Sequence, residues 1–586
     1  MGNNRKSQKK SNLCQFPSAQ FEGGRDNERD TTIINLAESV KSEGKKFISR
    51  ELNVVSSPSF SKMRFLAFCL LAAGILVLIF YGWFSSRSEN RVYFWGDKKY
   101  LTVAVPCDLA ASDPAVASDS LSAQILSPVF DTLVKIENGR VAPNLAKNWT
   151  CSADGKVWTF DLRSDVRFHN GVRLSSQTVV DWIERLIQGK NRSFSFFRAN
   201  FAGDRPVLAK VKILDKHRVQ FVLNYSCADF LELMAAPAMA VTVAVKQVDG
   251  LEEVYGSGPF TLSEWRIGQR VTLSAITQGW RGKSDLDKII FLVVTDPQSR
   301  VRELVRGNVD IILTLPADKI KQLKQNRDLR LIKPKTLAKL SLVPNCMYRP
   351  FNDVRGRLAL NFAIPKKSVL QLFFAGRGQV CHALFSPLSW AQVPSELQIE
   401  YSAVKAKRIF GRIYGNDAVL NKLTLLYCRN NYAAADLEPT ANFLASCLKS
   451  AGLQMTLYGA TSEEYKRSLA DNLYDLCLLA EEIPPLDPSL EANRMLSDPS
   501  RVHDEYNISN YCSQRILRLL EAARSTENRQ ERLECYKAVQ AKLDNDGLEF
   551  VIGWTDLVHA CRKDVHSLYP DRWGVLHFEN AFIDKT

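Results

Sequence analysis

Residues 142–186 read APNLAKNWTCSADGKVWTFDLRSDVRFHNGVRLSSQTVVDWIERL, and this stretch says more about the fold than any other part of the chain. Apolar and polar residues alternate over 157–162, which predicts a half-buried strand. Asp-Gly at 154–155 and Asn-Gly at 170–171 predict tight turns, because glycine tolerates the positive φ angles that such turns need. Apolar residues at helical spacing behind a polar cap predict a helix over 176–186.

The rest of the chain mixes strands and helices in the same way. A stripe of apolar residues predicts a helix over 532–543, which ends at the Asp-Asn-Asp-Gly of 544–547. Apolar and β-branched runs predict strands over 99–105, 289–294, 423–428 and 454–458. The alternation of strands and helices predicts a mixed α/β architecture, and the lack of a linker after residue 90 predicts interleaved lobes.

Length and charge narrow the classes of protein to which the chain can belong. A chain of 586 residues is too long for one compact core, and 46% apolar residues exclude wholesale disorder. Of the net charge of +14, residues 1–64 supply +5, from 12 Lys/Arg against 7 Asp/Glu. The remainder shows no basic stripe with interleaved aromatic residues, so we expect no nucleic-acid partner.

The segment from Phe65 to Phe84, FLAFCLLAAGILVLIFYGWF, contains no charged residue. At about 1.5 Å of rise per residue it is long enough to cross the hydrocarbon core of a bilayer, about 30 Å thick. Residues 1–64 are polar and rich in Lys and Arg, so we expect them to form a disordered tail in the cytoplasm. The chain after Phe84 is then expected in the periplasm or extracytoplasmic space, and the protein is expected to cross the inner membrane once. A cleaved signal peptide that starts at Met63 is the alternative, but the bulky end of the segment at Trp83 and Phe84 favours an uncleaved anchor.

The sequence lacks the motifs of common enzyme classes. No G-x-S-x-G, no H-E-x-x-H and no helix-opening G-x-G-x-x-G is present, and the seven histidines are scattered without a carboxylate at ligand spacing. We therefore expect no catalysis, no metal site and no cofactor. None of the thirteen cysteines forms a C-x-x-C pair, and most are expected to be small buried residues, such as Cys447 and Cys535. Any disulfide pairing stays open.

Several residues of 142–186 form an ordered series of short motifs, which continues along the chain. The members of the series in this stretch are Pro143, Leu145, Ala146, Trp149, Asp154, Gly155, Trp158, Phe160, Leu162, Arg163, Val166, Phe168, His169 and Gly171. Outside it follow Ser-Asp-Pro at 112–114, GSGPF at 256–260, GNVD at 307–310 and DVRGRLALNFAI at 353–364. The series resembles that of the family 5 extracellular solute-binding proteins of ABC importers, the oligopeptide and dipeptide type, from about Tyr100 to near the C-terminus.

This resemblance implies a periplasmic-binding-protein-like fold of type II, cluster C, preceded here by one transmembrane helix. Two lobes joined by a hinge close over the ligand, and an extra domain is built onto the first lobe. The implied division assigns 98–136, 255–335 and 556–586 to lobe I, 137–254 to the extra domain and 336–555 to lobe II.

The resemblance also implies where a ligand binds. In peptide-binding members the segment after the early L-D-P lines the cleft, and its counterpart here is Ala117, Ser118, Asp119 and Ser120. A second lining segment carries an acid that pairs with the α-amine of the peptide, but this chain has Pro484 at that position. Glu481 and Glu482 lie just before it, and we expect Glu482 to supply the carboxylate that an ammonium group requires.

The function that follows is capture of oligopeptides for an ABC permease complex by a membrane-anchored binding protein. Nickel chelates, haem and sugars stay open as ligands, because one fold serves many solutes. The alternative function is that of a membrane-tethered sensor or scaffold that signals through residues 1–64.

Overall fold

A computed structural model describes residues 99–584 of the chain, all within one compact unit, Asp97–Thr586. Gaps in the description fall at 118, 138, 189–206, 248–251, 392, 396–398, 415–421, 430, 434–436, 484–487 and 489–506. The predicted tail, the predicted span from Phe65 to Phe84, and Ser118 therefore lie outside the described residues. Within the described part of the chain, no helix has the length and apolarity needed to cross a membrane.

The stretch 142–186 supplies two neighbouring strands and one helix of a domain that is built on a four-stranded sheet, which we call the side domain. Its strands run in the order β4 (Ala146–Cys151), β5 (Val157–Leu162), β7 (Arg218–Leu223) and β6 (Leu208–Asp215), and α4 (Ser176–Gln188) and α6 (Phe230–Met234) accompany them. The predicted strand and helix are confirmed, and both predicted turns have glycine at positive φ, +69° at Gly155 and +86° at Gly171. Phe160 and Trp182 are buried in the core of this domain, as alternation and helical spacing require.

A seven-stranded sheet forms the first lobe. Its strands are ordered β10 (Phe260–Arg266), β11 (Arg270–Ala275), β12 (Lys288–Val293), β1 (Tyr100–Val105), β13 (Ile311–Ile312), β20 (His559–Arg562) and β14 (Leu329–Ile332). The central strand β1 runs parallel to both β12 and β13. The helices α3 (Ser120–Leu126), α7 (Pro297–Val305) and α8 (Ile320–Lys324) contribute to the two apolar cores of this lobe.

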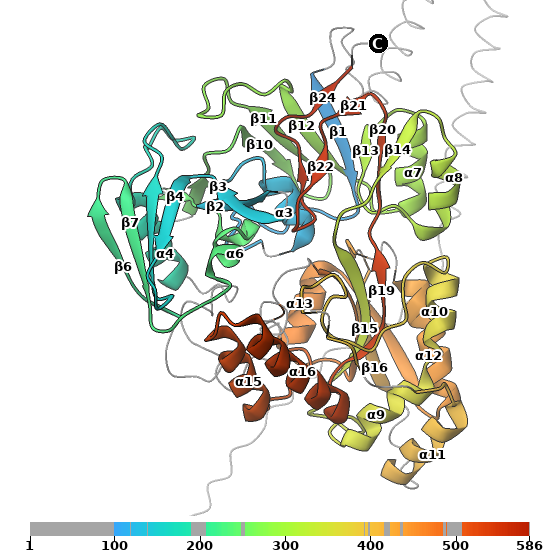
Figure 1. The fold of residues 1–586 in the computed structure, drawn as a ribbon. Coiled ribbons are helices and arrows are strands. Elements are labelled where there is room, and N and C mark those ends of the chain that lie inside the picture. Colours follow the sequence, from blue (N-terminus) through green and yellow to red (C-terminus); the bar gives the residue numbers. More distant parts are fainter. Residues whose placement is uncertain are drawn as a thin grey trace, which may run out of the picture. The chain divides into compact units, whose positions relative to one another are not determined.

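A five-stranded sheet forms the second lobe, below the first in Figure 1. Its strands are ordered β17 (Met455–Ala460), β16 (Leu423–Cys428), β18 (Leu476–Ile483), β15 (Leu337–Pro344) and β19 (Phe550–Asp556). The helices of this lobe are α9 (Val354–Ala363), α10 (Lys366–Phe373), α11 (Ala403–Tyr414), α12 (Glu438–Ser450), α13 (Ser462–Ala470), α15 (Gln514–Arg524) and α16 (Arg529–Asp546). The predicted helix 532–543 lies within α16, which ends at Gly547 in a left-handed conformation.

The chain passes between the two lobes through two short connections. Residues 333–336 join β14 to β15, and residues 557–558 join β19 to β20. Short ladders complete the fold: β2 (Val134–Glu137) with β3 (Arg140–Pro143), β8 (Val243–Lys246) with β9 (Glu252–Tyr255), β21 (Val565–His566) with β24 (Phe582–Ile583), and β22 (Tyr569–Pro570) with β23 (Leu576–His577). Two short 3-10 turns lie at Pro237–Met239 and Ala317–Lys319. The mixed α/β fold that the sequence predicts is confirmed, whereas the domain boundaries stay predictions.

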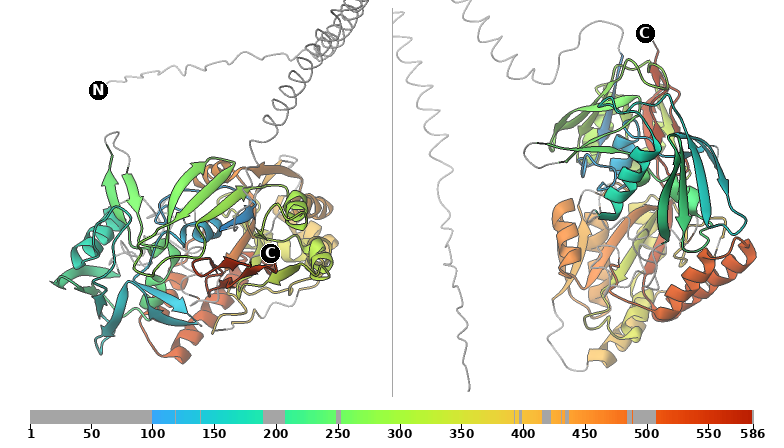
Figure 2. Two further views of the ribbon diagram at one scale, coloured as in Figure 1. Left: turned by 90° about the horizontal axis from the view of Figure 1, so that it is seen from above. Right: turned by 90° about the vertical axis from the view of Figure 1, so that its left-hand side faces the viewer.

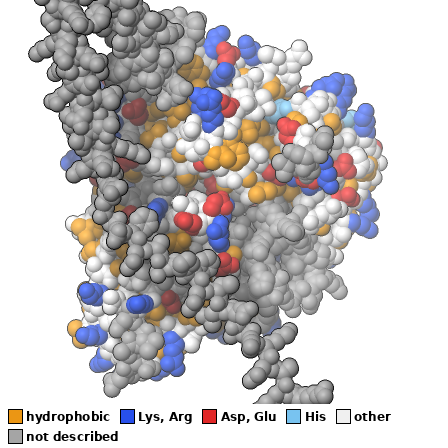
Figure 3. Space-filling model, turned by 180° about the vertical axis from the view of Figure 1, so that it is seen from behind, with side chains coloured by type: hydrophobic (Ala, Val, Ile, Leu, Met, Phe, Trp, Pro, Cys, Tyr) orange, Lys and Arg blue, Asp and Glu red, His pale blue; other side chains and the backbone are white. Residues whose placement is uncertain are grey.

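Cysteine chemistry and surface charge add two facts to this architecture. All eleven cysteines of the described chain are free thiols, so the structure contains no disulfide among them. Cys447 is buried as predicted, and Cys535 is partly buried. Figure 3 shows the rear face, on whose upper part acidic and basic side chains lie interspersed between apolar patches.

Candidate functional site

Parallel strands from both lobes end at the boundary between the lobes. In the first lobe these strands are β1 and β13, and in the second lobe they are β16 and the parallel part of β18. Thr314, just after β13, donates its hydroxyl to the carbonyl of Tyr432, just after β16, at 2.7 Å. Crevices at the carboxyl ends of parallel strands are where open α/β sheets bind ligands, so this boundary is the candidate site.

Glu482 of β18 is the central residue of this boundary. Its carboxylate is 6% exposed, and Oε1 accepts a hydrogen bond from the Thr336 hydroxyl at 2.6 Å. Oε2 is buried and has no well-aligned hydrogen-bond partner among the described residues. Burial raises the pKa of Glu482 to about 7, although hydrogen bonds from Thr336 and Ser120 lower it. Gly574 lies against Oε1 so closely that a Cβ there would overlap it.

The two predicted glutamates point to opposite faces of β18, because neighbouring side chains of a strand alternate. Glu482 faces Ser120 and Gly574 of the first lobe, whereas Glu481 lies in register with Lys339 of β15. Lys339 is fully buried and forms an ion pair with Glu549 at 3.1 Å. Burial raises the pKa of Glu549, and the neighbouring charge of Glu481 adds to that rise. The structure therefore brings Glu482, but not Glu481, to the first lobe.

The predicted segment of the first lobe leads into α3. Asp119 is the N-cap of this helix and accepts hydrogen bonds from the amide of Ser122 at 2.9 Å and from its hydroxyl at 2.6 Å. Ser120 begins the helix and is the member of the segment that reaches Glu482. Ala117 is buried and lines a neighbouring cavity. The segment thus supplies one hydrogen-bonding contact to the boundary, from Ser120.

Besides Thr336 and Gly574, the boundary holds Thr314, His559 and Tyr432, and none of these five residues was predicted from the sequence. Thr314 has φ of +55°, a left-handed conformation that is strained for a β-branched residue. Its amide donates to Nδ1 of His559 at 3.1 Å, which leaves the proton of the neutral imidazole on Nε2. Burial lowers the pKa of His559 to about 4, and Nε2 has no hydrogen-bond partner among the described residues. The hydroxyl of Tyr432 is also buried without a well-aligned partner.

The only signal in the sequence for these residues is their position next to a strand. Thr314 and Tyr432 follow β13 and β16, and His559 is the first residue of β20. None of them belongs to a recognisable motif. Buried polar groups normally have well-aligned partners, so the grouping of Oε2 of Glu482, the hydroxyl of Tyr432 and Nε2 of His559, which lack them among the described residues, makes this boundary the candidate site for a polar ligand.

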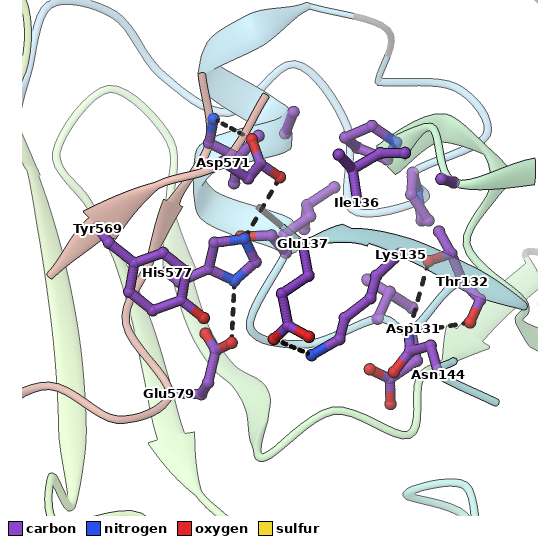
Figure 4. Close-up of a pocket in the computed structure, with 18 of the residues that line it drawn as sticks. Asp131, Thr132, Lys135, Ile136, Glu137, Asn144, Tyr569, Asp571, His577 and Glu579 are labelled. Atoms are coloured by element: carbon purple, nitrogen blue, oxygen red, sulfur yellow. Dashed lines mark hydrogen bonds and ion pairs between the residues drawn. The ribbon is translucent and has the colours of Figure 1, made fainter. Parts of the chain in front are cut away.

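A cavity of about 200 Å³ lies beside this boundary, between α3, β2 and the hairpin β22–β23 (Figure 4). The ring of His577 stacks on Tyr569 and lies between Glu579 at 2.9 Å and Asp571 at 3.3 Å. Burial alone would lower the pKa of His577, but the hydrogen bonds to the two carboxylates outweigh it and raise the pKa to about 9. The fold thus brings two carboxylates to His577, and Asp571 reaches it across the hairpin although it lies six positions away in the sequence.

The charges that line this cavity compensate one another. Asp131, which is 2% exposed, pairs with Arg281 at 2.5 Å, and Lys135 pairs with Glu137 at 3.0 Å. No group of three or more His, Cys, Asp or Glu side chains in the described chain is arranged to hold a metal ion. The cavity therefore differs from the boundary at Glu482, where Oε2 of Glu482, the hydroxyl of Tyr432 and Nε2 of His559 lack well-aligned partners among the described residues.

Comparison with known proteins places the chain among binding proteins. The profile of the bacterial extracellular solute-binding proteins, family 5 Middle, matches residues 140–499. The dipeptide-binding protein of Escherichia coli K12 is 25% identical over 488 residues, covering 78% of this chain and 89% of that protein. The nickel-binding periplasmic protein of the same strain is 30% identical over 299 residues, 49% of this chain and 56% of that protein.

Solved structures agree on the fold. The periplasmic binding protein DppA of Helicobacter pylori, in complex with the peptide STSA, superimposes with a TM-score of 0.74 at 22% identity and covers 83% of this chain and 98% of that one. NikA of Staphylococcus aureus, in complex with Ni(L-His)2, superimposes with a TM-score of 0.72 at 17% identity and covers 83% and 100%. These relatives are solute-binding proteins and not enzymes. Because the family profile spans more than half of the chain, the chain belongs to the bacterial extracellular solute-binding proteins of family 5.

Proposed function

We propose that this protein captures oligopeptides in the crevice between its two lobes and delivers them to an ABC permease complex. The observation that carries the proposal is the buried Oε2 of Glu482, an acceptor without a well-aligned partner at the point where strands of both lobes end. A free α-amine supplies three N–H donors and a positive charge, which is what a buried carboxylate with an open oxygen requires. The E. coli relative is named for dipeptides and the H. pylori structure holds a peptide, which supports the same class of ligand.

Each predicted site residue that the structure describes has a proposed role in capture. Ala117, Asp119 and Ser120 belong to the wall of the first lobe, in which Asp119 fixes the start of α3 and Ser120 contacts Glu482. Ser118, the fourth predicted residue, lies outside the described residues. Glu482 receives the amine of the ligand. Glu481 lies on the opposite face of β18, in register with Lys339, and is proposed to influence the buried ion pair of Lys339 with Glu549 and not to contact the ligand.

Capture is proposed to close the lobes about the connections 333–336 and 557–558. Because these two connections are short and adjacent in the sheets, rotation at a few backbone angles can move one lobe against the other. The hydrogen bond from Thr314 to Tyr432 and the contact of Ser120 with Glu482 both join the lobes, so both belong to the closed state.

The proposal extends to the location of the protein. Residues 65–84 anchor it as a single span in the inner membrane, with residues 1–64 in the cytoplasm and the lobes in the periplasm or extracytoplasmic space. Extraction of membranes with alkaline carbonate tests the anchor. A full-length chain that stays in the membrane pellet supports it, whereas a soluble chain shortened to begin near residue 85 contradicts it.

Isothermal titration of the full chain in detergent micelles tests the choice of ligand. Pools of short peptides are expected to release or absorb heat with one site per chain. Nickel–histidine complexes, haem and sugars serve as the competing ligands in parallel titrations. Binding of one of these with no response to any peptide pool would overturn the peptide proposal and leave only the solute-binding fold.

A further inference from the structure

Helix α11 has a basic outer face and an apolar inner face. Ala406 and Phe410 are buried against the second lobe, whereas all the Lys and Arg residues of the helix are exposed. These exposed residues are Lys405, Lys407, Arg408 and Arg412. The helix contains no acidic residue, so no neighbour one turn away offsets these charges.

Two further lysines extend this surface beyond the helix. Lys407 lies beside Gly452, where a Cβ would be 3.4 Å from its Cγ, and the amide of Gly452 donates to the carbonyl of Lys449 at 3.0 Å. Lys449, in the last turn of α12, and Lys422, directly before β16, are both exposed. The residue after Lys422 donates to the carbonyl of Gln454, two positions beyond Gly452. We call the following six residues the basic face: Lys405, Lys407, Arg408, Arg412, Lys422 and Lys449.

The basic face is not neutralised by the rest of the second lobe. None of its members forms an ion pair with an acidic side chain of the described chain, whereas Lys537 on α16 pairs with Glu534 at 3.0 Å. Segments 401–414, 422–428 and 439–460 contain no Asp or Glu, and Asp417 lies outside the described residues. The lower part of the rear face in Figure 3 likewise shows Lys and Arg side chains with few acidic ones among them. Like charges on one face repel one another, and contact with an anionic surface relieves that repulsion.

The spread of the basic face and its apolar neighbours indicate the kind of anionic partner. The charges lie on one helix, at the end of a second helix and at the start of a strand, so they suit an extended surface and not a single small anion. Two large side chains beside them are also exposed, Val404 to 82% and Tyr401 to 48%. Basic residues next to an exposed apolar residue and a tyrosine are typical of surfaces that bind the headgroups of anionic lipids.

We infer that the basic face rests on the anionic headgroups of the membrane. The inference rests on the proposed anchor for the nearness of that membrane, because residues 85–98 can extend at most about 50 Å from the end of the span. Figure 1 and the right-hand view of Figure 2 agree that α11 lies at the end of the second lobe remote from the first lobe. The tether enters the first lobe at β1, so the tether and the basic face hold different lobes, and the protein lies along the membrane.

Acylation of lysine side chains in the full chain, followed by mass spectrometry, measures whether lipid covers the basic face. The ligand-free chain is placed in nanodiscs of phosphatidylcholine alone or of phosphatidylcholine mixed with phosphatidylglycerol. Lys422 and Lys449 are expected to react about fivefold more slowly in the anionic nanodiscs, because several basic residues near such a surface act together. A high salt concentration should abolish the difference, because salt screens exposed charges.

Two variants with equal changes of charge show whether the basic face is responsible. The first neutralises α11 and keeps both lysines that are measured, and it should abolish the effect of phosphatidylglycerol. Its substitutions are Lys405→Gln, Lys407→Gln, Arg408→Gln and Arg412→Gln. The matched control neutralises four exposed residues of the first lobe and should keep the effect. Its substitutions are Arg302→Gln, Arg306→Gln, Lys321→Gln and Lys324→Gln.

Three results would overturn the inference. The first is an equal rate of acylation at Lys449 in the two kinds of nanodisc, and equally slow rates would indicate a protein partner. The second is a difference that persists in the variant of α11. The third is a difference that is lost in the matched control as well, which would indicate an effect of net charge and not of this face.

These results are distinct from those that test the proposed function. If the chain stays in the membrane and binds peptides but the acylation rates ignore the lipid, the inference fails and the proposed function stands. If carbonate extraction releases a shortened chain that still sediments with phosphatidylglycerol vesicles, and the variant of α11 does not, the proposed anchor fails and the inference stands.

Discussion

The open oxygen of Glu482 predicts a measurable dependence of stability on pH. Burial raises the pKa of Glu482 from 4.5 to about 7, so the native protein binds a proton that the unfolded chain releases between these values. The free energy of unfolding therefore falls as pH rises from 4.5 to 7, because the native state holds more protons over that window. At 1.36 kcal/mol per pH unit, this amounts to a loss of about 3 kcal/mol that is complete above pH 7.

Substitution of Glu482 by Gln removes the titrating proton and keeps the shape of the side chain. Relative to this variant, the native chain is expected to lose about 3 kcal/mol of unfolding free energy between pH 5 and pH 8. Urea denaturation of the ligand-free full chain at a series of pH values measures this difference. The figure is a ceiling, because opening of the lobes hydrates the carboxylate and relieves part of the penalty.

Thr336→Val tests the same reasoning by keeping the titration of Glu482 and shifting its pKa. The Thr336 hydroxyl lowers the pKa of Glu482, so its removal should raise that pKa further, enlarge the total loss of stability and extend that loss to higher pH. A constant difference in unfolding free energy between the native chain and Glu482→Gln from pH 5 to pH 8 would refute the account of Glu482 as a buried, partly unsatisfied carboxylate.

Three further predictions follow from other contacts. Gly574→Ala should destabilise the protein by about 2 kcal/mol or more in urea denaturation, because the new methyl group overlaps Glu482 at a φ of +82°, whereas Gly376→Ala, at +68° with open space around it, isolates the backbone part of the cost. His577→Gln should remove stability that the native chain has below pH 6.5 and loses as pH rises through about 9, so denaturation curves of the two chains should converge at alkaline pH and not at neutral pH. All eleven cysteines of the described chain should react with a thiol reagent in denatured, unreduced protein, and a lower count that rises after reduction would contradict the free thiols.

The sequence predicts the local structure of 142–186 well because each element there depends on short-range rules. Alternation defines β5 with the bounds that the structure has, and the spacing of apolar residues finds α4 to within two residues. The turns at Gly155 and Gly171 follow from the backbone freedom of glycine. The order of these elements then supports the family resemblance, from which the two lobes follow.

The site is less accessible to the sequence, because it forms between segments far apart in the chain. Alternation in β18 separates Glu481 from Glu482, but only the packing of the lobes shows which of them meets Ser120. The left-handed conformation of Thr314 and the orientation of His559 also depend on that packing. No pattern of residues next to each other in the chain encodes such a contact.

The central claim is that Glu482 receives the amine of a bound peptide. The most direct measurement compares the dissociation constants of one peptide, with a free and with an acetylated N-terminus, for the native chain and for Glu482→Gln. The native chain is expected to prefer the free amine by about tenfold or more, since hydrogen bonds to charged groups contribute about 1.5–3 kcal/mol, and Glu482→Gln is expected to lose that preference. Equal affinity of the native chain for both peptides, or an undiminished preference in Glu482→Gln, would contradict the claim.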